Sequence, residues 1–122
     1  MSENVSISKE QLLEVLNGFN HKHISVTVAT ANAAVCNFRR FENFKYKESF
    51  RKDDLIFKNY DDFDGKVYIK QSMIKEIYIE PFCGIDGYTI KLNDDTEIFL
   101  YDVDLYETIQ NKDEDGDEGW NQ

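Results

Sequence analysis

The chain has 122 residues, a formal net charge of −10, and 41% hydrophobic and 14% aromatic residues. This length predicts a single domain with one core, and no stretch reaches the roughly 20 apolar residues that a membrane span needs. The N-terminus lacks the basic and apolar regions of a secretory signal, so we expect a cytoplasmic protein. Two cysteines, Cys36 and Cys83, are too few for a disulfide framework and are expected to be reduced thiols.

The first predicted element is a short helix over residues 9–17. Ser8 is a suitable N-cap, and Gln11 stands three residues later, which is the spacing of a capping box. Gly18 is expected to follow the helix as its C′ residue. The apolar stripe that contains Leu12 and Leu16 predicts that the helix covers one face of a sheet.

A strand over residues 24–30 and a second strand over residues 34–41 are predicted next. His21 and His23 precede them, and in an extended segment two residues at this spacing point to one side, where they could share a metal ion. No third ligand stands at a matching spacing, so solvated loop histidines are the favoured interpretation and no metal or cofactor is expected.

The segment 38–58 interleaves aromatic and basic residues, which is typical of a groove for single-stranded nucleic acid. Four acidic residues within the segment reduce its positive charge. A strand and a loop with buried rings and exposed charged residues explain the same sequence. We therefore keep a nucleic-acid patch as the alternative interpretation. Its candidate residues are Arg39, Arg40, Lys45, Lys47, Arg51 and Lys52.

Residues 66–102 show the clearest periodicity, because apolar and polar residues alternate as they do in a half-buried sheet. Short connections predict an antiparallel meander of four strands. Pro81 is expected to end the second strand, because it has no N–H for the ladder, and residues 82–86 are expected to form a loop. Asn93 opens a hairpin turn. The predicted strands cover residues 66–70, 74–80, 87–92 and 96–102.

A short helix is predicted over residues 103–110, and residues 111–122 form an acidic tail outside a domain that covers residues 1–110. The tail begins like a calcium loop but has Gln122 where the bidentate Glu should stand, so no calcium is expected. Residues 94–122 hold eleven acids and one lysine, which accounts for the whole negative excess. This end is the candidate partner-binding surface, with these residues: Asp94, Asp95, Glu97, Asp102, Asp104, Glu107, Asp113, Asp115, Asp117 and Trp120.

Together these patterns predict an α+β fold, in which an N-terminal helix packs on an antiparallel sheet of about five or six strands. A barrel-like closure of the sheet is the alternative. The chain has no GxSxG, HExxH or Walker motif, so we expect a protein that is not an enzyme.

The favoured function is a small acidic protein-binding module. Spread carboxylates imitate a nucleic acid and occupy the basic groove of a nucleic-acid-handling protein. Phage-encoded anti-defence inhibitors and bacterial toxin-immunity proteins are often small and acidic in this way, and the Lys-, Asn-, Ile- and Tyr-rich usage is typical of a low-GC bacterium or its phage. The alternatives are a nucleic-acid-binding module that uses segment 38–58, and a plain structural module that forms homo-oligomers.

Overall fold

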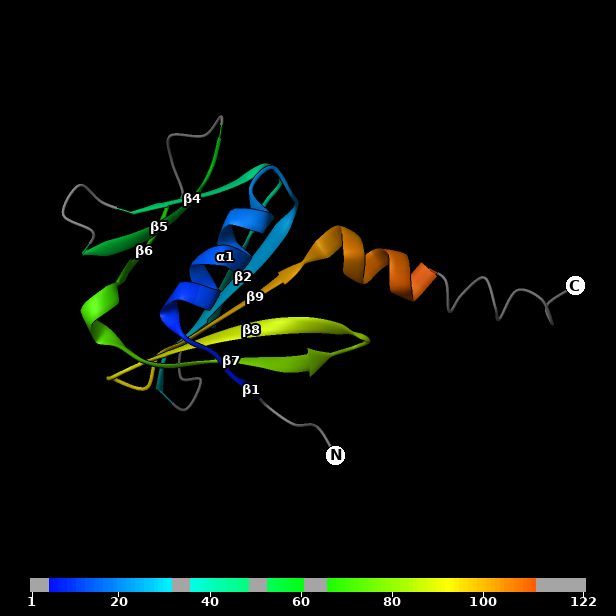
Figure 1. Cartoon of the computed structure of the whole chain (residues 1–122). Coiled ribbons are helices and arrows are strands. Elements are labelled where there is room, and N and C mark those ends of the chain that lie inside the picture. Colours follow the sequence, from blue (N-terminus) through cyan, green and yellow to red (C-terminus); the bar gives the residue numbers. More distant parts are fainter. Residues whose placement is uncertain (1–4, 32–35, 49–52, 61–65, 112–122) are drawn as a thin grey trace, which may run out of the picture.

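The strands form two antiparallel sheets, and helix α1 packs where the sheets meet (Figure 1). The structure is a computed structural model that describes residues 5–31, 36–48, 53–60 and 66–111. A helix over residues 103–111 follows the last strand and is called here the C-terminal helix. The other elements are β1 (Val5–Ser6), α1 (Lys9–Phe19), β2 (Ile24–Ala29), β3 (Cys36–Phe41), β4 (Phe44–Glu48), β5 (Asp54–Asn59), β6 (Val67–Lys70), the 3-10 turn η2 (Gln71–Met73), β7 (Ile74–Phe82), β8 (Ile85–Leu92) and β9 (Glu97–Asp102).

The six-stranded sheet has the order β1-β7-β8-β9-β2-β3, and the three-stranded sheet has the order β4-β5-β6. All neighbouring strands in the described residues run antiparallel. The α+β class and the antiparallel sheet are therefore confirmed, but the expectation of a single sheet is wrong, because β4, β5 and β6 form a second sheet. The barrel-like alternative is wrong, because the strands divide into two sheets that do not close on each other.

Helix α1 begins where the sequence predicts, but it ends later. The side chain of Ser8 accepts the N–H of Gln11, and the Gln11 side chain accepts the N–H of Ser8, which completes the capping box. The predicted end at Gly18 is wrong, because the helix runs to Phe19. The left-handed residue that redirects the chain is His21, with φ of 70°.

The predicted four-strand meander is confirmed for β7, β8 and β9 but is wrong for β6, which pairs with β5 in the other sheet. The turn η2 carries the chain between the sheets. The backbone N–H of Gln71 donates to the carbonyl of Asp53 at 2.8 Å, and its side-chain amide donates to Glu48 at 3.0 Å. These contacts are long-range in sequence, so strand periodicity alone does not reveal them.

The predicted stop at Pro81 is also wrong, because β7 continues to Phe82 and Pro81 lies opposite Asp86. Within the described residues, β1 pairs with β7 at Tyr78 and Ile79 and no strand pairs with Pro81 on that side, and a sheet tolerates proline where it has no second partner strand. The connection predicted as a loop over residues 82–86 is instead a two-residue turn. Cys83 and Gly84 both have positive φ there, as a tight hairpin requires.

Phe44 lies at the junction of all three layers and is fully buried. Its ring contacts Phe19 of α1, Phe41 of the six-stranded sheet and Phe57 of the three-stranded sheet, with centroids 6.2, 6.0 and 5.5 Å away. The chain passes from β3 to β4 just before it, through Glu42 and Asn43. One core therefore serves both sheets and the helix.

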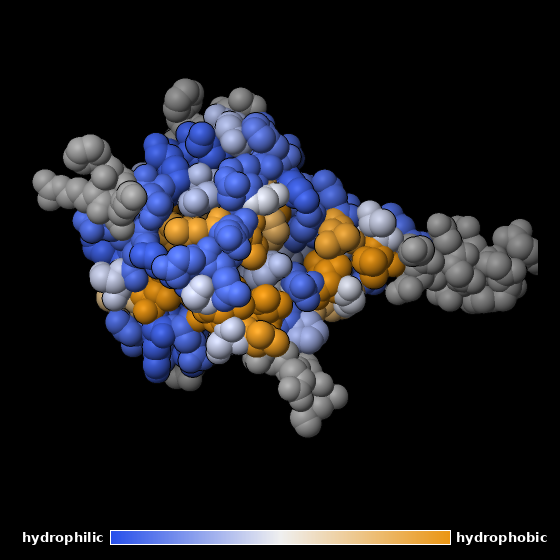
Figure 2. Space-filling model, viewed as in Figure 1, coloured by the Kyte–Doolittle hydropathy of each residue, from blue (hydrophilic) through white to orange (hydrophobic). Residues whose placement is uncertain are grey.

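Neither described helix has the length and apolar composition needed to cross a bilayer. Cys36 and Cys83 are both free thiols, and both are exposed. Figure 2 shows the face that carries α1, where hydrophilic side chains predominate and apolar surface gathers along the flanks of α1 and on the C-terminal helix.

We expect Phe44→Ala to lower the free energy of unfolding by roughly 3–5 kcal/mol, because it leaves a cavity where the helix and both sheets meet. Phe38→Ala is the matched control, since Phe38 is 65% exposed. The control should cost less than about 1 kcal/mol. Urea unfolding measures both, and equal losses for the two variants would contradict the central role of Phe44.

Candidate functional site

The face of the six-stranded sheet that points away from α1 carries a continuous cross-strand row. Alternation in β2 turns Ile24 and Val26 into the core, so Thr27 projects from the opposite face. The strand register aligns five residues side by side across the sheet: Tyr78 of β7, Thr89 of β8, Phe99 of β9, Thr27 of β2 and Phe38 of β3. Aromatic and threonine side chains alternate along this row. Thr89 is buried between its larger neighbours, whereas Tyr78, Phe99 and Thr27 are half-buried.

Carboxylates surround the Tyr78 end of the row. Glu76 and Glu97 lie on either side of Lys91 in the neighbouring row, and the Lys91 ammonium is 4.0 Å from the Glu97 carboxylate. The Thr89 hydroxyl donates to the carboxylate of Glu80. Three acids against one lysine leave this region negative. We call it the acid–aromatic face, and its residues are Glu76, Tyr78, Glu80, Thr89, Lys91, Glu97 and Phe99.

The negative charge of this face affects the pKa of the Tyr78 hydroxyl. Burial raises the pKa of the Tyr78 hydroxyl above its ordinary value of 10.0, and the carboxylates of Glu97, Glu80 and Glu76 raise it further. Each of these negative charges opposes formation of a second negative charge on the phenol. Tyr78 therefore keeps its proton and can donate a hydrogen bond throughout the neutral pH range.

An aromatic cluster fixes the C-terminal helix to the other end of the same sheet face. Phe82 lies 5.2 Å from Phe99 and 4.7 Å from Tyr101, and it stacks on Tyr106 of the helix at 5.5 Å. The side-chain amide of Gln110 donates to the backbone carbonyl of Cys83 at 3.3 Å. This cluster covers one end of the face and leaves the end with Tyr78 to the carboxylates.

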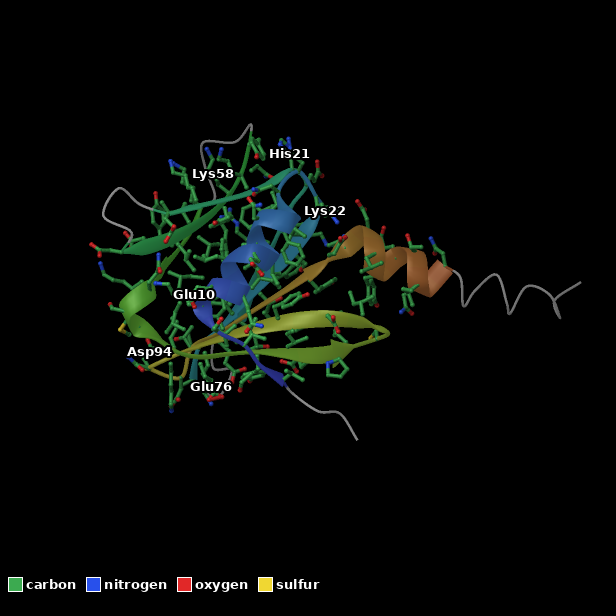
Figure 3. The ribbon with its side chains drawn as sticks, in the orientation of Figure 1. Glu10, His21, Lys22, Lys58, Glu76 and Asp94 are labelled. Atoms are coloured by element: carbon green, nitrogen blue, oxygen red, sulfur yellow. The ribbon has the colours of Figure 1, made fainter. Side chains whose placement is uncertain are left out.

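The acidic residues predicted as one partner-binding surface lie at two ends of β9. Asp94 and Asp95 are in the β8–β9 turn beside Glu97, whereas Asp102 and Asp104 are at the start of the C-terminal helix, with exposed Glu107 one turn on. Six residues of strand separate the two groups by roughly 17 Å. In Figure 3, Asp94 and Glu76 lie at one end of the molecule and Lys22, the partner of Asp102, lies away from them. Asp113, Asp115, Asp117 and Trp120 lie outside the described residues.

Several of these acids have structural roles. An Asp94 carboxylate oxygen accepts the N–H of Thr96 at 3.0 Å, and this backbone hydrogen bond lowers the pKa of Asp94. Asp102 caps the C-terminal helix by accepting the N–H of Leu105 at 3.0 Å. Asp104 lies 3.7 Å from the imidazole of His23. These carboxylates therefore stabilise the turn or the start of the C-terminal helix. Glu76, Tyr78, Glu80 and Phe99 were not predicted as site residues from the sequence.

The predicted basic patch is divided between the sheets. Arg39 and Arg40 are successive residues of β3 and so point to opposite faces, whereas Lys45 and Lys47 lie on β4 in the three-stranded sheet. Arg51 and Lys52 lie outside the described residues. The two halves of segment 38–58 therefore do not form one groove.

The two histidines have separate surroundings. His21 is in a turn rather than an extended segment, so the two rings do not share a side. Its ring stacks on Tyr60 at 3.9 Å, and its Nδ1 is 3.1 Å from the side-chain oxygen of Asn43. His23 lies beside Asp104 instead. Within the described ranges, no three His, Cys, Asp or Glu side chains are grouped to hold a metal ion.

A shallow depression of about 320 Å³ lies beside the start of the C-terminal helix. Its lining includes the Lys22–Asp102 ion pair, which joins atoms 3.7 Å apart, together with Asp104, Leu105 and Thr108. Lys22 and Asp102 pair with each other, Asp102 also caps the helix, and Asp104 pairs with His23, so this depression is a feature of helix docking.

Comparison of the chain with protein-family models, with curated proteins and with solved structures finds no match. The acid–aromatic face is the candidate site on physical grounds. It is the part of the sheet where rings remain accessible and carboxylates gather without capping a turn or a helix.

We expect Gly87→Ala to lower the free energy of unfolding by about 1–3 kcal/mol, because an added Cβ would lie 2.4 Å from the Phe99 ring. The ring is held in place by Phe82 and Tyr101. Gly18→Ala in α1 is the control, since nothing lies within 4 Å of the added Cβ. It should stabilise by roughly 0.5–1 kcal/mol. Thermal unfolding of both variants tests the packing of Phe99 over Gly87.

Glu97→Gln should lower the pKa of Tyr78, because Glu97 exerts the largest charge effect on it. The measurement is ultraviolet titration of phenolate, with Tyr78→Phe subtracted to isolate this ring. Glu10→Gln on α1 is the control and should leave the midpoint unchanged. Since the folded pKa exceeds the unfolded value of about 10, the associated stability is complete below pH of about 10 and is lost as the pH rises through the folded pKa. An unchanged midpoint in Glu97→Gln would contradict the placement of the two groups.

Proposed function

We propose that the chain is a small, acidic, non-enzymatic binding module that holds a basic segment of a partner protein against the acid–aromatic face. The observation that carries this proposal is the cross-strand row from Tyr78 to Phe38, with Glu76, Glu80 and Glu97 around one end. Exposed rings provide contact area, and the carboxylates select the charge of the partner.

The energetics of such a contact follow from the two kinds of side chain. Aromatic residues dominate the binding energy of protein interfaces when they become fully desolvated. Phe38 is 65% exposed, and Tyr78 and Phe99 are partly exposed, so a partner has ring surface left to bury. Carboxylates at the rim contribute mainly to the rate of association and to the choice of partner.

The partner class that fits this chemistry is a nucleic-acid-handling protein with a basic surface. Glu76 and Glu97 lie in one row on either side of Lys91, and with Asp94 in the turn beyond them they present several negative charges along one edge of the face. Carboxylates held along the edge of a sheet can replace phosphates in a basic groove. Small acidic inhibitors encoded by phages and toxin-immunity proteins offer an analogy of composition for this mode of action.

The test is affinity capture from a bacterial lysate, followed by measurement of the dissociation constant with each purified candidate. Glu76→Gln/Glu80→Gln/Glu97→Gln removes the three carboxylates around Tyr78. It should weaken binding at least tenfold and reduce the salt dependence of association, because rim charges act on the approach of a partner.

The matched control is Glu10→Gln/Glu14→Gln/Glu42→Gln, which makes the same charge change at three exposed acids outside this face. It should bind as the wild type does. A partner that both triple variants retain equally would refute the face, and a chain that ends at Gln110 shows whether residues 111–122 add to the affinity. Capture of no basic protein at low salt would refute the proposal as a whole.

A further inference from the structure

The three-stranded sheet presents a face of lysines to solvent, on the side away from the core. Phe44, Leu55, Phe57 and Ile69 point into the core, so alternation turns the residues between them outward. These outward residues form three cross-strand rows. They are Lys45, Lys58 and Lys66 in the first row, Lys47, Ile56 and Tyr68 in the second, and Asp54 and Lys70 in the third.

The first row places like charges directly opposite one another. Lys45 lies directly opposite Lys58, and the register of β5 with β6, continued by one residue, places Lys66 opposite Lys58. Directly opposed like charges destabilise an antiparallel pair. Proteins break local rules of this kind most often at functional sites.

Opposing charge within the described part of β4–β6 is sparse on this face. Alternation places one carboxylate there, Asp54, which lies 3.8 Å from the ammonium of Lys70. Of the other four lysines, three form the first row and Lys47 lies in the second row, where Tyr68 is 60% exposed and Ile56 is 8% exposed. Beyond the first row, the Lys45 ammonium lies 4.7 Å above the ring of Tyr60, which stacks in turn on His21.

We propose that this lysine face binds the backbone of single-stranded nucleic acid, with Lys45, Lys58 and Lys66 on phosphates and Tyr68 against a base. Grooves for single strands combine cations that track the backbone with rings on which bases stack, and this face has both. Lysine binds phosphate as a point charge and needs no planar fork, which suits a backbone without fixed register.

Two other occupants fit less well. A membrane surface favours projecting apolar side chains, whereas the aliphatic side chain of this face, Ile56, is buried under its neighbours. The acid–aromatic face of a second copy has the opposite charge, but its carboxylates lie around Tyr78 and Lys91 rather than in an unbroken row. Both occupants are outcomes that the following experiment separates.

The experiment is fluorescence anisotropy with a labelled oligothymidylate of about 15 nucleotides, titrated with the full chain between about 50 and 200 mM salt. Wild type should bind, and Lys45→Gln/Lys58→Gln should bind at least tenfold more weakly at the low-salt end. The slope of log affinity against log salt should fall by about 1.4, since each phosphate contact on a single strand contributes about 0.7.

Lys9→Gln/Lys75→Gln is the matched control, because it makes the same change in net charge at two exposed lysines outside this sheet. It should bind within about twofold of wild type, the difference that net charge alone accounts for. Tyr68→Ala should weaken binding and leave the salt slope unchanged, because it removes stacking and no charge. The melting temperature of Lys45→Gln/Lys58→Gln should be no lower than that of wild type, which shows that the loss is not unfolding.

The proposal is overturned if wild type fails to bind the oligonucleotide at low salt, or if the two double variants bind equally. If anionic vesicles or polyglutamate bind as tightly as the oligonucleotide, the proposal is overturned and the face attracts anions in general. If the chain self-associates and does not bind the oligonucleotide, the proposal is overturned and the occupant is a second copy of the chain. The Glu76→Gln/Glu80→Gln/Glu97→Gln variant should still bind the oligonucleotide. This proposal and the proposed protein-binding function can therefore fail separately.

Discussion

The rest of the structure depends on the burial of Phe44 at the corner where the chain leaves one sheet and enters the other. Its ring contacts rings of the helix and of both sheets. Backbone hydrogen bonds hold Phe44 there, since its N–H donates to the carbonyl of Lys22 and its carbonyl accepts the N–H of His21. Asparagine side chains satisfy other backbone groups at the corner, because Asn59 accepts the N–H of Asn43 and Asn20 accepts the N–H of Tyr46. Polar groups that would lose their strand partners at the bend are thus paired.

The same corner separates the two charged surfaces. Because Phe41 and Phe44 both point into the core although they are three residues apart, strict alternation is interrupted between them. The outward residues of β3 and of β4 consequently belong to different sheets. The carboxylates around Tyr78 and the lysines around Tyr68 lie on two sheets that share one core. Although the net charge is −10, these carboxylates gather on one sheet and these lysines on the other.

Short-range sequence patterns predicted the positions of the helices and strands well, but they predicted poorly which strands pair with each other. The capping box of Ser8 fixes the start of α1, and the alternation of β7 to β9 with the turn at Asn93 fixes a meander, because both depend on residues close in sequence. The transfer of β6 to a second sheet depends on bonds from Gln71 to Asp53 and Glu48, which no periodicity encodes. The lysine row was divided among three segments of the sequence, so only the register of three strands brings it together. The phase break at the corner also explains why no single strand alternation runs through segment 38–58.

The opposition of Lys45 and Lys58 makes the folded protein responsive to dissolved ions. An anion that neutralises this pair only when the strands are aligned binds the native state and not the unfolded chain, so mass action raises stability with its concentration. A multivalent anion that bridged the two ammonium groups would act in this way, in addition to the general effect of such anions on burial. The dependence of stability on the choice of salt thus has a local origin in one pair of side chains beside the general one.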